Sequence, residues 1–242
     1  MLTLILTRHG QAAADEVMLG GQIDVPLTPE GREEAGALAR RLAGVRIDRI
    51  VSSPMLRALE TAQIIATGRP VELDERLREL DYGRWESLTY AEIEARDPEW
   101  RARWEEDPAA THSPGGESGD DVAARASRFL VDLLATELGG SSGSVARRHS
   151  PDPGGSRGPV SEATAEAEGE RRVLVVAHGT YNRILMCVAL GVPVCEYRRR
   201  FLQDRANLTV LRYEPGDGPR GAQLILANDV AHLRRAGGVP WG

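Results

Sequence analysis

The chain has 242 residues, of which 41% are hydrophobic, and this content is enough for one sizeable core. Its 30 basic and 36 acidic side chains give a net charge of −6, which argues against a general binder of nucleic acid or anionic membranes, since both need a basic surface. Cys187 and Cys195 are too few for a disulfide framework and lack metal-ligand spacing. Residues 1–8 lack the features of a signal peptide, so we expect a cytoplasmic protein without a membrane partner.

Short apolar runs alternate with longer amphipathic stretches along the first part of the chain, which is typical of an α/β domain with a mainly parallel sheet. The apolar runs predict strands at residues 2–7, 47–52 and 71–73. Thr28 followed by Pro29 predicts the start of a helix, because threonine caps the first turn and proline fits its first position. Ser53 and Pro54 repeat this signal before a second helix that reaches about residue 66.

The later part of the chain predicts a cap, a long helix, an insertion and three strands. Residues 80–120 are polar with helical tendency and predict a small helical cap. A helix beginning near Gly119 should bury Val122, Ala126, Phe129, Leu130, Leu133 and Leu134. Residues 139–170 are rich in glycine and serine and have too little apolar surface to offset the entropy of ordering, so we expect a disordered insertion. The remaining strands are predicted at 172–177, 207–213 and 222–227.

These elements predict a single domain over residues 1–242. The expected architecture is a three-layer α/β/α sandwich with a mostly parallel central sheet. Trp85, Trp100 and Trp104 could line a substrate lid, but packing of the cap on the sheet is the favoured interpretation of these aromatic side chains.

Two predicted strands end in a histidine that is followed by a glycine. One strand runs into Arg8-His9 and another into His178-Gly179. In an open parallel sheet, ligands bind beyond the carboxyl ends of the strands, so both imidazoles are expected at one rim. A single histidine of this kind would more often satisfy a local hydrogen bond. Two of them at matched strand ends, with an arginine beside the first, indicate a site.

Arg57 adds a third element to this rim. It lies about one turn inside the helix that follows strand 47–52. A helix N-terminus and a guanidinium both suit a phosphoryl group, because their N–H groups reach several oxygens at once. The alternative is an exposed arginine paired with Glu60 or Glu33. Beside Arg8 and the two histidines, we favour the phosphoryl site.

Five motifs follow one another along the chain. They are LTRHGQ at 6–11, DVPLTPEG at 24–31, SSPMLRALETA at 52–62, LRELDYGRWE at 77–86 and AHGT at 177–180. Together they resemble the histidine phosphatase superfamily, the phosphoglycerate-mutase-like group. The resemblance covers nearly the whole chain apart from residues 139–170.

This resemblance implies that His9 is the nucleophile and becomes phosphohistidine. Arg8, Arg57 and His178 would surround the transferred phosphoryl group, and Glu79 would donate a proton to the leaving oxygen. A neutral imidazole can attack phosphorus, while two arginines and a protonated His178 would offset the charge on the phosphoryl oxygens. No metal and no cofactor is then required, and the expected partner is a small phosphorylated metabolite.

Other positions are assigned with less detail. Those expected to border the substrate are Gly179, Asp15 and Gln22, and Asp15 stands where many relatives carry asparagine. Asp81 competes with Glu79 for the role of proton donor, although a carboxylate there could also cap a turn. Glu117 and Ser118 belong to a Gly-Gly-Glu-Ser sequence that is similar to a loop bordering the pocket in the family.

Two other functions compete with hydrolysis of a phosphate monoester. A cofactor-dependent phosphoglycerate mutase would share the first half-reaction, but residues 82–89 resemble the phosphatase branch more closely. A non-catalytic phosphate-binding module is disfavoured because all five chemical positions are present. A homodimer is compatible with the sequence.

Overall fold

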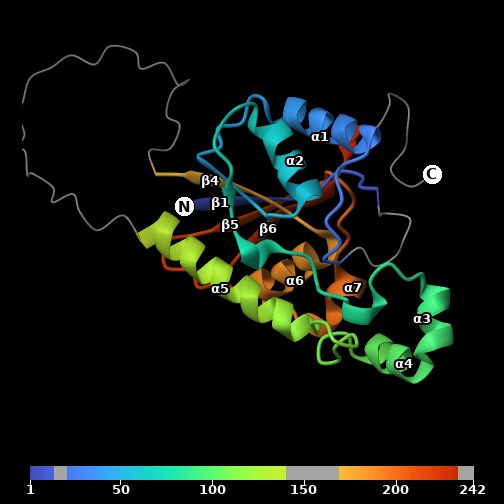
Figure 1. The fold of residues 1–242 in the computed structure, drawn as a ribbon. Helices are drawn as coiled ribbons and strands as arrows, with labels where there is room; N and C mark the ends of the chain where they lie inside the picture. Colours follow the sequence, from blue (N-terminus) through green and yellow to red (C-terminus); the bar gives the residue numbers. More distant parts are fainter. Residues whose placement is uncertain (14–20, 140–168, 234–242) are drawn as a thin grey trace, which may run out of the picture.

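A six-stranded sheet forms the centre of the computed structural model, which describes residues 1–13, 21–139 and 169–233 (Figure 1). The strands are β1 (Leu2–Arg8), β2 (Arg49–Ser52), β3 (Glu72–Leu73), β4 (Arg171–Ala177), β5 (Leu208–Tyr213) and β6 (Gln223–Asp229). Their order is β3-β2-β4-β1-β5-β6, in which the first four run parallel and β5 and β6 each pair antiparallel with their neighbour. The predicted mostly parallel sheet is confirmed, and β1 and β4 lie side by side at its centre.

Helices cover both faces of the sheet and give the predicted three layers (Figure 1). On one face lie α1 (Pro29–Leu42) and α2 (Leu56–Ala66), and on the other lie α5 (Gly119–Leu138) and α6 (Gly179–Leu190). The shorter helices are α3 (Tyr90–Arg96), α4 (Pro98–Glu106) and α7 (Tyr197–Arg200). Each face has its own cluster of buried apolar side chains. None of the helices in the described ranges is both long and apolar enough to cross a bilayer.

Helical periodicity gives the buried face of α5 correctly. All six apolar side chains predicted to be buried on this helix, from Val122 to Leu134, are buried. Ser118 caps the helix, because its hydroxyl accepts the N–H of Asp121 and the Asp121 carboxylate accepts the N–H of Ser118 in return. This reciprocal cap fixes where α5 begins, and the apolar stripe fixes which side faces the sheet.

The starts of α1 and α2 differ in how they are capped. The Thr28 hydroxyl accepts the N–H of Gly31 at 3.1 Å, as the sequence predicts. Helix α2 instead begins after Met55 and has no side-chain cap, so the second cap prediction is wrong. The Ser53 hydroxyl instead accepts the N–H of Met55 at 3.4 Å and lies 2.8 Å from Nε2 of His178.

Helices α3 and α4 project from one end of the sheet, within the range predicted for the cap (Figure 1). Trp85 and Trp104 are buried, and their rings meet edge to face with centroids 5.7 Å apart. The Trp85 indole N–H donates to Asp97 at 2.9 Å. Trp85 and Trp104 therefore pack the cap against the domain, as the favoured interpretation holds. Trp100 does not, because it is 41% exposed and its indole N–H donates to the carbonyl oxygen of His112.

Most of the predicted insertion, residues 140–168, lies outside the described residues. Its predicted last residue, Glu170, takes part in the domain. The Glu170 carboxylate accepts a hydrogen bond from the Thr3 hydroxyl at 2.8 Å and pairs with Arg172 at 2.7 Å. These contacts hold Glu170 beside the start of β1.

Candidate active site

His9 directly follows β1 and is only 4% exposed. Its Nδ1 lies 2.7 Å from the carbonyl oxygen of Gly10. A carbonyl can only accept, so we assign the ring proton to Nδ1 and the lone pair to Nε2. Burial holds the pKa of His9 well below its ordinary value, and the positive charges of Arg8 and Arg57 lower this pKa further. The imidazole is therefore neutral near pH 7.

The glycine after His9 is required by close packing. A Cβ added at Gly10 would lie 2.3 Å from the carbonyl oxygen of Gly31, in the first turn of α1. The N–H of Gly10 donates to the Thr61 hydroxyl of α2 at 3.1 Å. The chain beyond β1 is thus held between α1 and α2, and any side chain at position 10 would displace the backbone that carries His9.

Arg57 lies on α2, is 4% exposed and points back to the end of β1. Its Nε donates to Nε2 of His9 at 3.2 Å. Its two terminal nitrogens donate to the carbonyl oxygens of Ile23 at 2.7 Å and Gly21 at 2.9 Å. The guanidinium therefore joins His9 to the loop at 21–23, and the alternative of an exposed surface arginine is wrong.

His178 follows β4, is fully buried, and has its ring centroid 5.2 Å from that of His9. Burial and then the charge of Arg57 lower the pKa of His178 well below its ordinary value. Without a bound anion this lowering favours the neutral imidazole, and the protonated His178 expected beside a phosphoryl group stays a prediction. A buried positive charge beside two arginines is unfavourable unless an anion accompanies it.

Arg8 is held by the segment that precedes β5. Its backbone N–H donates to Oδ1 of Asn207 at 3.0 Å, and one terminal nitrogen donates to the carbonyl oxygen of Gln203 at 3.2 Å. The N–H of Ala206 donates to the carbonyl oxygen of Arg8 at 3.0 Å. These partners of Arg8 were not predicted, and the signal available in the sequence was the pair of amide side chains, Gln203 and Asn207, just before a predicted strand.

Glu79 is 9% exposed, and its carboxylate caps the N-terminus of α6. Its Oε2 accepts the N–H of Thr180 at 3.0 Å, and its Oε1 accepts the N–H groups of Tyr181 and Leu80, both at 2.9 Å. Because α6 begins immediately after His178, this cap brings the carboxyl group of Glu79 to the rim that carries the two histidines.

Two of the three positions predicted to border the substrate, Gly179 and Gln22, lie within the described residues. Gly179 packs against Arg8, since an added Cβ would lie 3.4 Å from its Nε. The Gln22 side chain donates to the carbonyl oxygen of Glu79 at 2.7 Å and so supports the segment that carries this carboxyl group. Asp15 lies outside the described residues.

Asp81, Glu117 and Ser118 all have protein partners. The Asp81 carboxylate accepts the N–H of Gly83 at 2.7 Å, which is the turn cap weighed as its alternative role. The Glu117 carboxylate pairs with Arg125 at 3.0 Å, and Ser118 caps α5. The structure therefore brings together Arg8, His9, Arg57, His178 and Glu79, and gives these three side chains structural contacts.

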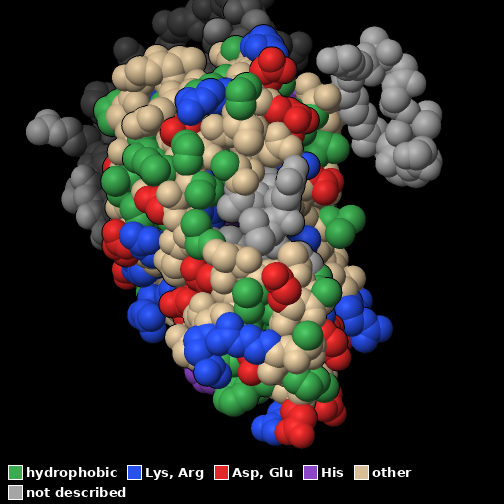
Figure 2. Space-filling model, turned by 45° about the vertical axis from the view of Figure 1, so that its right-hand side comes forward, with side chains coloured by type: hydrophobic (Ala, Val, Ile, Leu, Met, Phe, Trp, Pro, Cys, Tyr) green, Lys and Arg blue, Asp and Glu red, His purple; other side chains and the backbone are tan. Residues whose placement is uncertain are grey.

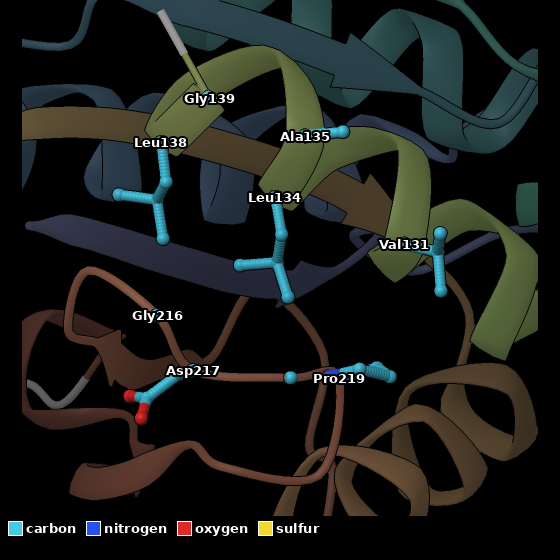
Figure 3. A pocket seen from close by; sticks show the side chains of 9 residues that line it. Val131, Leu134, Ala135, Leu138, Gly139, Gly216, Asp217 and Pro219 are labelled. Carbon is cyan, nitrogen blue, oxygen red and sulfur yellow. The ribbon is translucent and has the colours of Figure 1, made fainter. Parts of the chain in front are cut away.

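Two cavities lie away from the histidines. One, of about 350 Å³, separates the C-terminal half of α5 from the turn after β5 (Figure 3). It is lined by Val131, Leu134, Ala135, Leu138, Gly139, Gly216, Asp217, Gly218 and Pro219. The second, of about 490 Å³, lies between α5 and the end of α6. Asp217 is the charged side chain of the first cavity, and an apolar lining with a carboxylate does not suit a phosphate.

The burial of His9 and His178 predicts that the free energy of unfolding decreases as the pH decreases. Both pKa values are lower in the folded protein than the ordinary value of about 6.5, so the unfolded chain binds more protons below that pH. Stability is then fully present above about pH 6.5 and is lost as the pH decreases. Two such groups predict a slope of up to about 2.7 kcal/mol per pH unit, measurable by urea unfolding between about pH 7.5 and pH 5.

Substitution of either buried histidine tests which group causes this slope. His178→Asn should remove about half of it. An unchanged slope in both His178→Asn and His9→Asn would contradict the prediction.

A known family model covers most of the chain. The family model of the histidine phosphatase superfamily (branch 1) matches residues 4–148 and 157–223. A glucosyl-3-phosphoglycerate phosphatase of Mycobacterium tuberculosis is 36% identical over 198 residues, which are 80% of this chain and 78% of that protein.

Two solved structures are similar over almost the whole chain. Bacillus stearothermophilus YhfR has a TM-score of 0.77 and 29% identity, over 97% of this chain and 100% of that chain. A mycobacterial glucosyl-3-phosphoglycerate phosphatase has a TM-score of 0.73 and 32% identity, over 93% and 98% of the two chains. The chain therefore belongs to branch 1 of the histidine phosphatase superfamily.

Proposed function

We propose that this chain hydrolyses a phosphate monoester through a phosphohistidine intermediate on His9. The observation that carries the proposal is the hydrogen-bonding pattern of this imidazole. Because Nδ1–H is bound to the carbonyl oxygen of Gly10, the reactive lone pair is on Nε2, which faces Arg57 at 3.2 Å. The family and the phosphatase names of the relatives support the same reaction.

In the first step, Nε2 of His9 attacks phosphorus, the bond from phosphorus to the ester oxygen breaks, and Glu79 gives its proton to that oxygen. Oε2 of Glu79 accepts one hydrogen bond, from Thr180, so its second lone pair can carry the proton toward the leaving group. In the second step, Glu79 takes a proton from water while the water oxygen attacks phosphorus. The bond from phosphorus to Nε2 then breaks, and inorganic phosphate leaves.

The neighbouring side chains would stabilise the phosphoryl group during both steps. The Nε of Arg57 and the incoming phosphorus compete for the same lone pair on His9, so the guanidinium must turn its donor to a phosphoryl oxygen as the substrate arrives. Arg8 supplies a second guanidinium beside it. A phosphoryl group would also favour the protonated form of His178, because an opposite charge offsets the burial that keeps this imidazole neutral.

The substrate that we propose is a small phosphorylated metabolite, and the names of the mycobacterial relatives suggest sugar or glycerate phosphates for the first trials. On the face shown in Figure 2, acidic and basic side chains are mixed among the described residues, which favours a small substrate over nucleic acid. We also propose a cytoplasmic location, since neither Cys187 nor Cys195 forms a disulfide. The homodimer stays a prediction.

Turnover of an aryl phosphate in the presence of a chelator tests this function. Activity is expected to survive EDTA, because Arg8 and Arg57 supply positive charge at the site and His178 adds to it once a phosphoryl group favours its protonation. Vanadate should inhibit by resembling five-coordinate phosphorus. Loss of activity on chelation that zinc or magnesium restores would contradict the proposal. Isomerisation of a phosphoglycerate without release of inorganic phosphate would instead identify a mutase. Failure to turn over any phosphate ester would indicate a non-catalytic phosphate-binding module.

A further inference from the structure

Arg125, on α5, is a buried arginine that the proposed mechanism does not use. It is 9% exposed. Its Nε and one terminal nitrogen, Nη2, donate to the two carboxylate oxygens of Glu117, both at 3.0 Å. Its other terminal nitrogen, Nη1, donates to the carbonyl oxygens of Arg76 and Arg78, both at 2.6 Å. Nη2 also donates to the carbonyl oxygen of Glu79 at 3.1 Å.

These hydrogen bonds fix the backbone that carries the proposed proton donor. Three carbonyl oxygens of the segment 76–79 converge on one guanidinium, so the segment can shift only if several hydrogen bonds break together. The Glu79 side chain is held from the other side by the first N–H groups of α6. Tyr181 connects the two sides, because its N–H donates to Oε1 of Glu79 while its ring centroid lies 5.1 Å from the guanidinium carbon of Arg125.

Stability alone is a weak explanation for an arginine at this position. Removing a guanidinium from water is unfavourable, and well-packed apolar side chains often stabilise a fold as much as a buried ion pair does. A guanidinium has five N–H groups in a fixed planar arrangement, and Arg125 makes five hydrogen bonds with them. This match fixes the direction of each hydrogen-bond partner, and it thereby fixes the backbone that carries Glu79.

We infer that Arg125 is a positioning residue for the proton donor Glu79, and that Glu117 orients Arg125. This inference rests on the proposed function, because it gives Glu79 a catalytic task. Misplacing a catalytic group by about 1 Å can reduce a rate by about 10²-fold. Arg125 touches neither the substrate nor the reacting atoms in this mechanism. Its charge also lowers the pKa of His178, and a lysine keeps that charge, so a loss in Arg125→Lys reports on the position of Glu79.

Arg125→Lys tests the inference, because lysine keeps the positive charge but has a single nitrogen that cannot span Glu117 and three carbonyl oxygens. The kcat/KM for glycerol phosphate is expected to fall about 10²-fold. The kcat/KM for 2,4-dinitrophenyl phosphate should change much less, since its leaving group departs without a proton. An equal loss on both substrates would overturn the inference.

A double variant separates positioning from a general structural role. With Glu79→Gln already present, Arg125→Lys should add no further loss on glycerol phosphate, because no acid remains to be positioned. Additive losses would overturn the inference. Arg49→Lys is the matched control: Arg49 also binds two carboxylates, those of Glu72 and Glu137, and should show no dependence on the leaving group.

Glu117→Gln is the alternative test variant if Arg125→Lys does not fold. It leaves the arginine in place and removes the carboxylate that orients it, so a smaller loss with the same dependence on the leaving group is expected. An equal loss on both substrates would overturn the inference here too.

If Glu79→Gln itself shows no dependence on the leaving group, the proposed proton donor fails and the role of Arg125 fails with it. If only the Arg125 and Glu117 variants lack this dependence, the proposed function stands and this inference alone fails.

Discussion

His9→Ala is expected to abolish release of phosphate from every substrate. Removal of a covalent nucleophile reduces kcat on the order of 10⁶-fold in a well-studied hydrolase, and His9→Ala removes the Nε2 lone pair that faces Arg57. The measurement is turnover of an aryl phosphate by wild type and variant, at matched folded protein. Substantial activity in His9→Ala would show that another group attacks phosphorus.

The wild-type protein should also carry phosphate on His9 during turnover. A bond between phosphorus and imidazole nitrogen is labile in acid and stable in base, so rapid quenching into base should preserve the labelled protein and acid should release the label. His9→Ala should carry no label. His112→Ala, at an exposed histidine, is the control that should label and turn over as wild type does. A label in His9→Ala would assign the nucleophile elsewhere.

Glu79→Gln is expected to slow hydrolysis of alkyl phosphates by about 10²–10⁴-fold, the usual range for general acid catalysis. Glutamine has the size of glutamate, and its carbonyl oxygen can still accept N–H groups of α6, but it has no acidic proton to give. Aryl phosphates with acidic phenols should be slowed much less, because their leaving groups depart unprotonated. The dependence of kcat/KM on the leaving group is therefore the measurement.

Asp81→Asn is the matched control for Glu79→Gln. The Asp81 carboxylate accepts the N–H of Gly83 at 2.7 Å, and the carbonyl oxygen of asparagine can accept the same hydrogen bond. We therefore expect a small loss that does not depend on the leaving group. The reverse outcome, with equal losses on both substrate types for Glu79→Gln and a leaving-group-dependent loss for Asp81→Asn, would transfer the role to Asp81.

Much of the fold is readable from local sequence. The sequence of β4 is almost continuously apolar because this strand is covered on both faces, and the spacing of apolar residues on α5 follows from the helical repeat. The meeting of Arg8, His9 and His178 was also predictable. Parallel strands end at one edge of the sheet, and β1 pairs directly with β4, so residues that follow the two strands must be neighbours.

Tertiary structure decided the features that depend on partners distant in sequence. Ser53 looks like a helix cap by its local sequence, but its hydroxyl contacts His178, 125 positions away. The low pKa of His178 depends on burial by the whole domain and on the charges of Arg57, Arg8 and Arg125, which come from three other elements. The partners of Arg125 include three backbone carbonyl oxygens, and every residue has such an oxygen, so no residue type in the sequence marks them. Folding alone sets the direction of these groups, and with it the geometry around Glu79.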